Sequence, residues 1–143
     1  MPVFPSLEWG TALSASLNSN PEFKEAAGSW DGTILLSCLA EEGKLGEDLH
    51  FLVDPSHGNV KEIKQVSSPE EANATYTLAA KYTVWKEILQ GKYDAPDAIK
   101  KGRIKLKGNL FKLMMNVKAP KIMINAMRDM PTQFVDEINA SQN

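Results

Sequence analysis

The fold is decided by the stretch from Trp85 to Met114, which reads WKEILQGKYDAPDAIKKGRIKLKGNLFKLM. Up to Leu89 the apolar residues recur at helical spacing, and Gly91 follows as a helix-ending residue. Residues 103–107 then alternate between basic and apolar side chains, which is the period of a β-strand. From Leu110 the helical spacing returns. This stretch therefore predicts a helix, a connection, a strand and a further helix.

Charged and turn-forming residues support the connections within this stretch. A short helix is predicted from about Pro96 to Lys101, with Asp94 and Asp97 near its start and Gly102 beyond its end. Gly108-Asn109 supplies a bend and an N-cap for the helix that follows. In that helix an i, i+3, i+4, i+7 stripe predicts a core-facing side, with extra apolar residues beside it.

The chain before Trp85 predicts two helices followed by four strands. The helices run from the N-cap Ser6 to about Leu17 and from the N-cap Asn20 to just before Gly28. The strands are expected at 33–40, 48–53, 59–66 and 74–80. Short turns join the first three strands, so we expect these three to form an antiparallel meander.

The chain after Met114 predicts a helical C-terminal extension over residues 118–143. Pro120 opens a helix in which Met123 and Met127 lie one turn apart, and Pro131 ends it. Residues 132–139 are expected to form a last turn or two of helix.

The composition indicates one domain of 143 residues without a membrane-spanning segment. The apolar fraction is 43% and the charged fraction 24%, both typical of globular chains, and no apolar run approaches 18 residues. No signal-peptide pattern is present at the start, so we expect a cytoplasmic protein. The single Cys38 lies in an apolar run and is expected to be a buried structural thiol. Residues 98–128 hold nine of the sixteen Lys and Arg residues and no Asp or Glu.

This order of elements resembles the sterol carrier protein 2 (SCP-2) domain family. The resemblance covers roughly residues 30–117, and Asn109 stands where the family often has Asp. Its matching motifs are Gly91-Lys92, Asp94 to Asp97, Gly102 to Gly108, and Leu110 to Leu113. The resemblance implies an α+β fold, with a five-stranded, mainly antiparallel sheet covered by helices. It also implies an internal hydrophobic tunnel that binds a fatty acid, fatty acyl-CoA, sterol or phospholipid, and no shared catalytic residues.

By position, the resemblance places apolar residues from the helices and strand of this stretch in the tunnel wall. These are Trp85, Ile88, Leu89, Ile104, Leu106, Phe111, Leu113, Met114 and Met115. Met123 and Met127 are added from the sequence itself, because flexible Met side chains suit chains of varying shape. Lys105, Lys107 and Lys112 are the candidates to meet an anionic headgroup or a transient anionic membrane surface.

Simpler interpretations of these residues stay open. Apolar helical stripes are more often ordinary core, and a run of lysines is usually a solvated face. The main hypothesis is non-catalytic intracellular lipid binding or transfer. The alternatives are a membrane- or protein-docking module that uses the basic C-terminal helices, and an accessory domain of a lipid-modifying enzyme. The sequence leaves the oligomeric state and the identity of the lipid open.

Other classes of function lack a motif. His50, Asp54 and His57 have no metal-ligand spacing, and no nucleophile or phosphate-binding signature occurs, so we expect no metal, cofactor or catalytic residue. Nucleic acid is not expected as a partner, because the chain is acidic overall and aromatic residues are sparse among the lysines.

Overall fold

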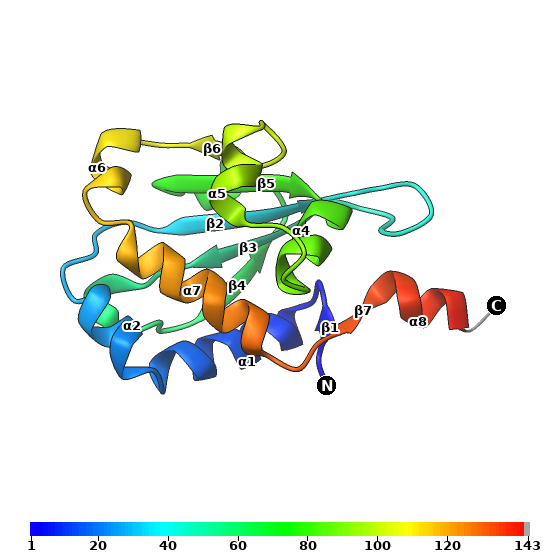
Figure 1. Ribbon diagram of the computed structural model, residues 1–143, viewed down its shortest axis with the longest axis horizontal. Helices are drawn as coiled ribbons and strands as arrows, with labels where there is room; N and C mark the ends of the chain where they lie inside the picture. The colour runs from blue at the N-terminus through cyan, green and yellow to red at the C-terminus, as the bar shows by residue number, and fades with distance from the viewer. Residues whose placement is uncertain (142–143) are drawn as a thin grey trace.

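The computed structural model describes residues 1–141, so Gln142 and Asn143 at the end of the predicted extension lie outside the described residues. Helices cover one face of a five-stranded sheet, and a two-stranded pair joins the two ends of the chain (Figure 1). The predicted α+β class with a five-stranded sheet is confirmed.

The strands are β1 (Val3–Phe4), β2 (Ile34–Leu39), β3 (Leu49–Val53), β4 (Ile63–Val66), β5 (Tyr76–Lys81), β6 (Lys105–Lys107) and β7 (Gln133–Phe134). The helices are α1 (Leu7–Asn18), α2 (Pro21–Ala26), α3 (Pro69–Ala72), α4 (Tyr82–Leu89), α5 (Ala95–Lys100), α6 (Leu110–Met114), α7 (Lys118–Asp129) and α8 (Val135–Ser141). A 3-10 turn, η1 (Ser56–Gly58), lies between β3 and β4.

The large sheet has the strand order β4-β3-β2-β5-β6. Strands β2, β3 and β4 form the predicted antiparallel meander. The chain then returns to place β5 parallel to β2, with Ile34 opposite Tyr76, and β6 pairs antiparallel to β5 at the edge. Three of the four strand pairs are therefore antiparallel, as expected.

The predicted helix caps are present. Ser6 accepts a hydrogen bond of 3.0 Å from the backbone N–H of Trp9, and Asn20 accepts bonds from the first turn of α2. Asn109 accepts a bond of 3.1 Å from the backbone N–H of Lys112. The amide oxygen of Asn109 thus caps the helix at the position where the family that this sequence resembles often has a carboxylate.

Several boundaries differ from those predicted. The short helix α3 and the pair β1–β7 were not expected, since each has too few residues to show a period. Helix α7 begins at Lys118 rather than at Pro120, and α6 ends at Met114. In the tail, β7 pairs parallel to β1 before α8 begins, so residues 132–139 are not all helical.

The core lies between the helix-facing side of the sheet and helices α1, α4 and α7. Helices α1 and α7 cross this face together, whereas α8 extends away from the body of the molecule (Figure 1). Strand β2 is buried along nearly its whole length, at Leu36 on the side that faces the cavity and at Leu35 on the other side. Among the described residues, no helix has the length and hydrophobicity needed to cross a bilayer.

Candidate functional site

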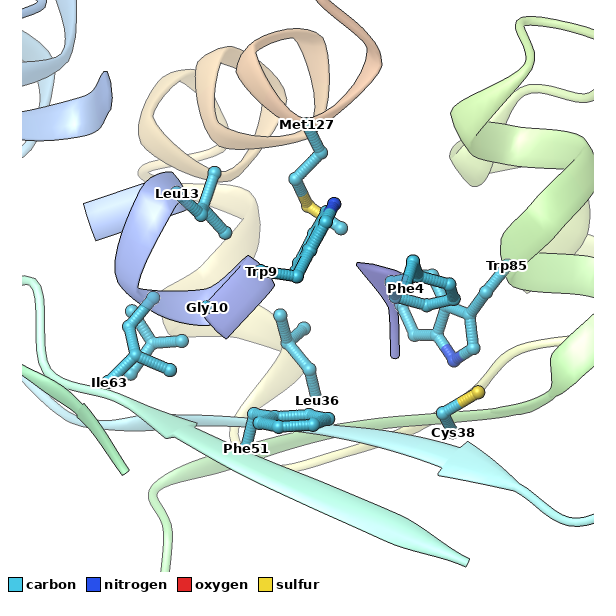
Figure 2. A pocket seen from close by; sticks show the side chains of 11 residues that line it. Phe4, Trp9, Gly10, Leu13, Leu36, Cys38, Phe51, Ile63, Trp85 and Met127 are labelled. Atoms are coloured by element: carbon cyan, nitrogen blue, oxygen red, sulfur yellow. The ribbon is translucent and has the colours of Figure 1, made fainter. Parts of the chain in front are cut away.

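A small apolar cavity lies between the sheet and helices α1, α4 and α7 (Figure 2). The side chains of Leu36 and Phe51 form its floor, and Trp9 and Met127 reach toward it from α1 and α7. Its other lining residues are Phe4, Gly10, Leu13, Cys38, Val53, Ile63 and Trp85. The cavity measures about 10 Å³, whereas ligand sites measure about 300–1,000 Å³. Its chemistry suits a hydrocarbon, but its present volume suits about one water molecule.

A row of buried apolar side chains on α7 runs from the cavity toward the start of that helix. Ala119, Met123 and Met127 recur every four residues and are all buried. Eight residues of helix span about 12 Å, so this stripe joins the start of α7 to the cavity. Met123 and Met127, both predicted from the sequence, therefore cover the core along a line rather than at one point.

The α4 residues of the predicted wall are buried. The side chain of Trp85 lines the cavity, and its indole Nε1 donates a hydrogen bond of 2.9 Å to the backbone carbonyl oxygen of Ser37. Ile88 and Leu89 are buried beside it, as is Ile104 at the approach to β6. These residues are part of the hydrophobic core.

The α6 residues of the predicted wall lie in a different environment. Only Leu113 packs against the core, where it is half-buried. Phe111, Met114 and Met115 are exposed, and Leu106 on β6 is half-buried. The expectation of a core-facing stripe on this helix was wrong, because Leu110, Met114 and Val117 point outward together with Phe111 and Met115.

The lysines proposed for a headgroup have separate structural settings. Lys105 and Lys107 are exposed on the edge strand β6, opposite Ala79 and Thr77. Charged side chains on an edge strand discourage pairing with other chains, which accounts for the basic alternation without a ligand. Lys112 on α6 lies 3.7 Å from the exposed carboxylate of Asp31.

Two arginines of the basic segment serve as structural clamps. Arg128 on α7 donates hydrogen bonds to the backbone carbonyl oxygens of Ile88 (2.9 Å) and Tyr93 (2.8 Å), and so ties the end of α7 to the end of α4. The guanidinium of Arg103 lies 4.7 Å from the ring centroid of Tyr93 and 3.4 Å from Glu87. Part of the positive charge in residues 98–128 therefore stabilises contacts within the fold.

The electrostatics of the interior fit an apolar site. Burial raises the pKa of the Cys38 thiol well above its ordinary value, so the thiol stays protonated and acts as a small apolar group, as predicted. On the opposite face of β2, Ser37 Oγ and His50 Nδ1 share a buried hydrogen bond of 2.7 Å. His50 is thus engaged within the sheet, whereas His57 of η1 is exposed.

A polar cluster toward the start of α4 contacts the C-terminal helix α8. The hydroxyl of Tyr82 donates a hydrogen bond of 2.6 Å to Asp136 of α8, and Lys86 Nζ lies 3.0 Å from both carboxylate oxygens of Asp136. Burial acts to raise the pKa of Asp136, but the bonds from Tyr82 and Lys86 outweigh it and hold the pKa below its ordinary value. This cluster anchors α8 to α4 through charge.

The sequence interpretation missed most of the cavity lining. Leu36 and Cys38 on β2 alternate with Leu35 and Ser37, which predicts a shared face, and Phe51 lies opposite Leu36 in the register. The α1 lining residues Trp9 and Leu13 share a helical stripe with Leu17. Their place at this cavity, like that of Phe4 on β1, depends on how the N-terminus packs across the sheet.

Comparisons with known proteins agree with this fold. Among solved structures, a crystal structure of sterol carrier protein 2 is 24% identical, with a TM-score of 0.78 over 88% of this chain and 98% of that chain. A possible sterol carrier protein from Thermus thermophilus is 24% identical, with a TM-score of 0.77 over 90% of each chain. A ubiquinone synthesis protein with an SCP2 fold is 15% identical, with a TM-score of 0.56 over 92% of this chain and 98% of that chain.

The comparison by sequence family covers more than half of the chain. A comparison with curated protein sequences gave no match. Residues 12–120 match the SCP-2 sterol transfer family, which extends the resemblance beyond residues 30–117 into α1 and α2. The chain belongs to the SCP-2 sterol transfer family.

Proposed function

We propose that this protein binds one lipid molecule without changing it covalently, and that the acyl chain or sterol body lies between the sheet and helices α1, α4 and α7. Membership of the SCP-2 sterol transfer family supports lipid binding or transfer as the general function. The observation that carries the specific proposal is the cavity lined by Trp85, Met127 and other apolar side chains at the centre of the fold.

The energy of chain burial sets a condition on how the site opens. A sixteen-carbon chain is worth about 13 kcal/mol at ~0.8 kcal/mol per buried CH₂. Association costs at least ~4 kcal/mol, which leaves about 9 kcal/mol, and micromolar binding needs about 8 kcal/mol. Opening the interior must therefore cost little, so we propose that it involves a weakly held element rather than the core helices.

Helix α6 meets this condition. It is five residues long, it packs on the core through Leu113, and its ion pair between Lys112 and Asp31 is exposed. Exposed ion pairs contribute about 0–1 kcal/mol. Only residues 115–117 separate α6 from α7. We therefore propose that movement of α6 opens the end of the Ala119-Met123-Met127 stripe, where flexible Met side chains make room for a chain.

The test is uptake of a fluorescent fatty acid and a fluorescent sterol by the purified full chain, together with organic extraction and mass spectrometry. We expect saturable uptake of one molecule per chain, co-purifying lipid, or both. Met127→Phe places a rigid ring in the cavity lining and should weaken uptake in a folded protein, whereas Met130→Phe, at the C-cap of the same helix and outside the cavity lining, should retain it. Absence of both lipid and saturable uptake in the wild-type protein would overturn the proposal.

A further inference from the structure

The exposed apolar residues of this protein gather in one short segment. Among the described residues, seven large hydrophobic side chains are exposed, and five of them lie within residues 110–117. These five form what we call the α6 surface: Leu110 (52% exposed), Phe111 (75%), Met114 (75%), Met115 (74%) and Val117 (54%). Scattered exposed hydrophobic residues are normal, but a contiguous group marks an interaction site.

The order of the residues in α6 places these apolar side chains on one side of the helix. Successive residues of an α-helix are turned by about 100°, so Leu110, Met114, Phe111 and Met115 span an arc of roughly 140°. Leu113 lies outside this arc and is the residue that packs on the core. Leu113 is therefore the one apolar side chain of this helix that packs on the core, and the wider apolar arc faces the surroundings.

Charge identifies the partner that fits this surface. Lys107 precedes α6, Lys118 and Lys121 follow it, and all three are exposed. Residues 98–128 contain no acidic residue, although Asp31 faces Lys112 at 3.7 Å. A bilayer with anionic lipids presents negative headgroups above a hydrocarbon layer, and long lysine side chains reach headgroups while apolar neighbours insert below them.

The rest of the molecule has the opposite charge. Outside residues 98–128 the chain has seven Lys and Arg residues and all eighteen Asp and Glu residues. An anionic surface would attract the basic segment and repel the remainder, which orients α6 toward the bilayer. Two protein chains of this kind would have no such charge complementarity between their α6 surfaces.

We propose that the α6 surface docks on an anionic lipid bilayer, with Phe111, Met114 and Met115 inserted below the headgroups and Lys107, Lys118 and Lys121 among them. This inference rests on the proposed lipid-binding function, for which the bilayer is the donor or acceptor of lipid. The inner stripe of α7 begins beside α6, so docking would place the route to the cavity against the bilayer.

Vesicle binding tests this proposal. Full-length protein is mixed with vesicles of phosphatidylcholine alone and of phosphatidylcholine with phosphatidylserine, and the bound fraction is measured by sedimentation. We expect binding to the anionic vesicles that weakens as salt is added. The double variant Phe111→Ser and Met115→Ser should bind at least about tenfold more weakly, because each loses roughly the burial of one side chain. Lys118→Gln and Lys121→Gln should each reduce binding about fivefold.

Matched controls separate docking from folding and from lipid uptake. Leu7→Ser alters an exposed apolar residue on α1 and should leave vesicle binding unchanged. A thiol probe attached through Met115→Cys should shift to shorter emission wavelengths on anionic vesicles, and the same probe attached through Leu7→Cys should not. The buried Cys38 will not compete for the label.

The outcomes are distinct from those that test the lipid site. Saturable fatty acid uptake without binding of wild-type protein to anionic vesicles would overturn the docking proposal and leave the lipid site standing. Equal vesicle binding by the wild type and the double variant would also overturn docking. A dimer in light scattering that is lost on Phe111→Ser, without vesicle affinity, would show that a second copy covers the α6 surface instead. Vesicle binding without any lipid uptake would contradict the proposed function alone.

Discussion

The indole nitrogen of Trp85 donates a hydrogen bond of 2.9 Å to the backbone carbonyl oxygen of Ser37. This bond joins α4 to the central strand β2 and turns the apolar face of the indole toward the cavity. We expect Trp85→Phe to lower the free energy of unfolding by about 1–3 kcal/mol, because the bond and part of the ring volume are lost. Urea unfolding measures this change. An unchanged free energy of unfolding would show that the bond does not hold α4 in place.

The cavity leads to a prediction about packing at Met127. Met127→Ala enlarges an apolar space that the folded chain cannot fill, and such changes cost about 2–5 kcal/mol. Met115→Ala removes a side chain of the same type from the surface and should change the free energy of unfolding by less than about 0.5 kcal/mol. Equal losses in urea unfolding would contradict the contrast between a buried and an exposed methionine.

Residues on the two sides of α6 should contribute unequally to the free energy of unfolding. Leu113→Ala removes the residue that packs this helix on the core, whereas Phe111→Ala removes one that is largely exposed. We expect Leu113→Ala to cost about 1–2 kcal/mol, since Leu113 is half-buried, and Phe111→Ala to cost less than about 0.5 kcal/mol. Hydrogen exchange of the α6 amides should rise in the first variant. A larger loss for Phe111→Ala would mean that the α6 surface is packed in solution.

Gly108 positions the start of α6 by a close approach. Its φ is +129°, and an added Cβ would lie 2.6 Å from Tyr76 Cδ1 and 2.8 Å from the Thr75 carbonyl oxygen. Gly102 also has a positive φ, of +76°, but nothing lies within 4 Å of its added Cβ. Both alanine variants carry backbone strain, and Gly108→Ala should cost about 1–3 kcal/mol more because of the clash. Thermal unfolding of the two variants side by side is the measurement.

The link between Asp136 and α4 should depend on pH. Because the pKa of Asp136 is lower in the folded protein, its contribution to stability is complete above the ordinary value of about 3.9 and is lost as the pH falls through the folded value. Asp136→Asn should cost about 1–2 kcal/mol at neutral pH and less in acid. Urea unfolding at both pH values, with the exposed Glu25→Gln as control, tests this. A loss that is the same at both would contradict the role of the charge.

Local chemistry made most of the fold predictable. The caps at Ser6, Asn20 and Asn109 and the two-residue period of the strands act over a few residues, and these elements were confirmed near their expected positions. Pairing of β1 with β7 joins residues about 130 positions apart. Neither strand has enough residues to show a period, so the pair could not be predicted.

The candidate site was predictable only in its chemistry. The sequence by itself determined that residues 110–117 are apolar and are flanked by lysines without acidic neighbours. The tertiary structure decided that Leu113 faces the core while Phe111 and Met115 face outward, and that Met123 and Met127 lie over the sheet. Helical spacing establishes which residues share a face, but the neighbouring elements decide which face is buried. That choice depends on contacts between distant parts of the chain.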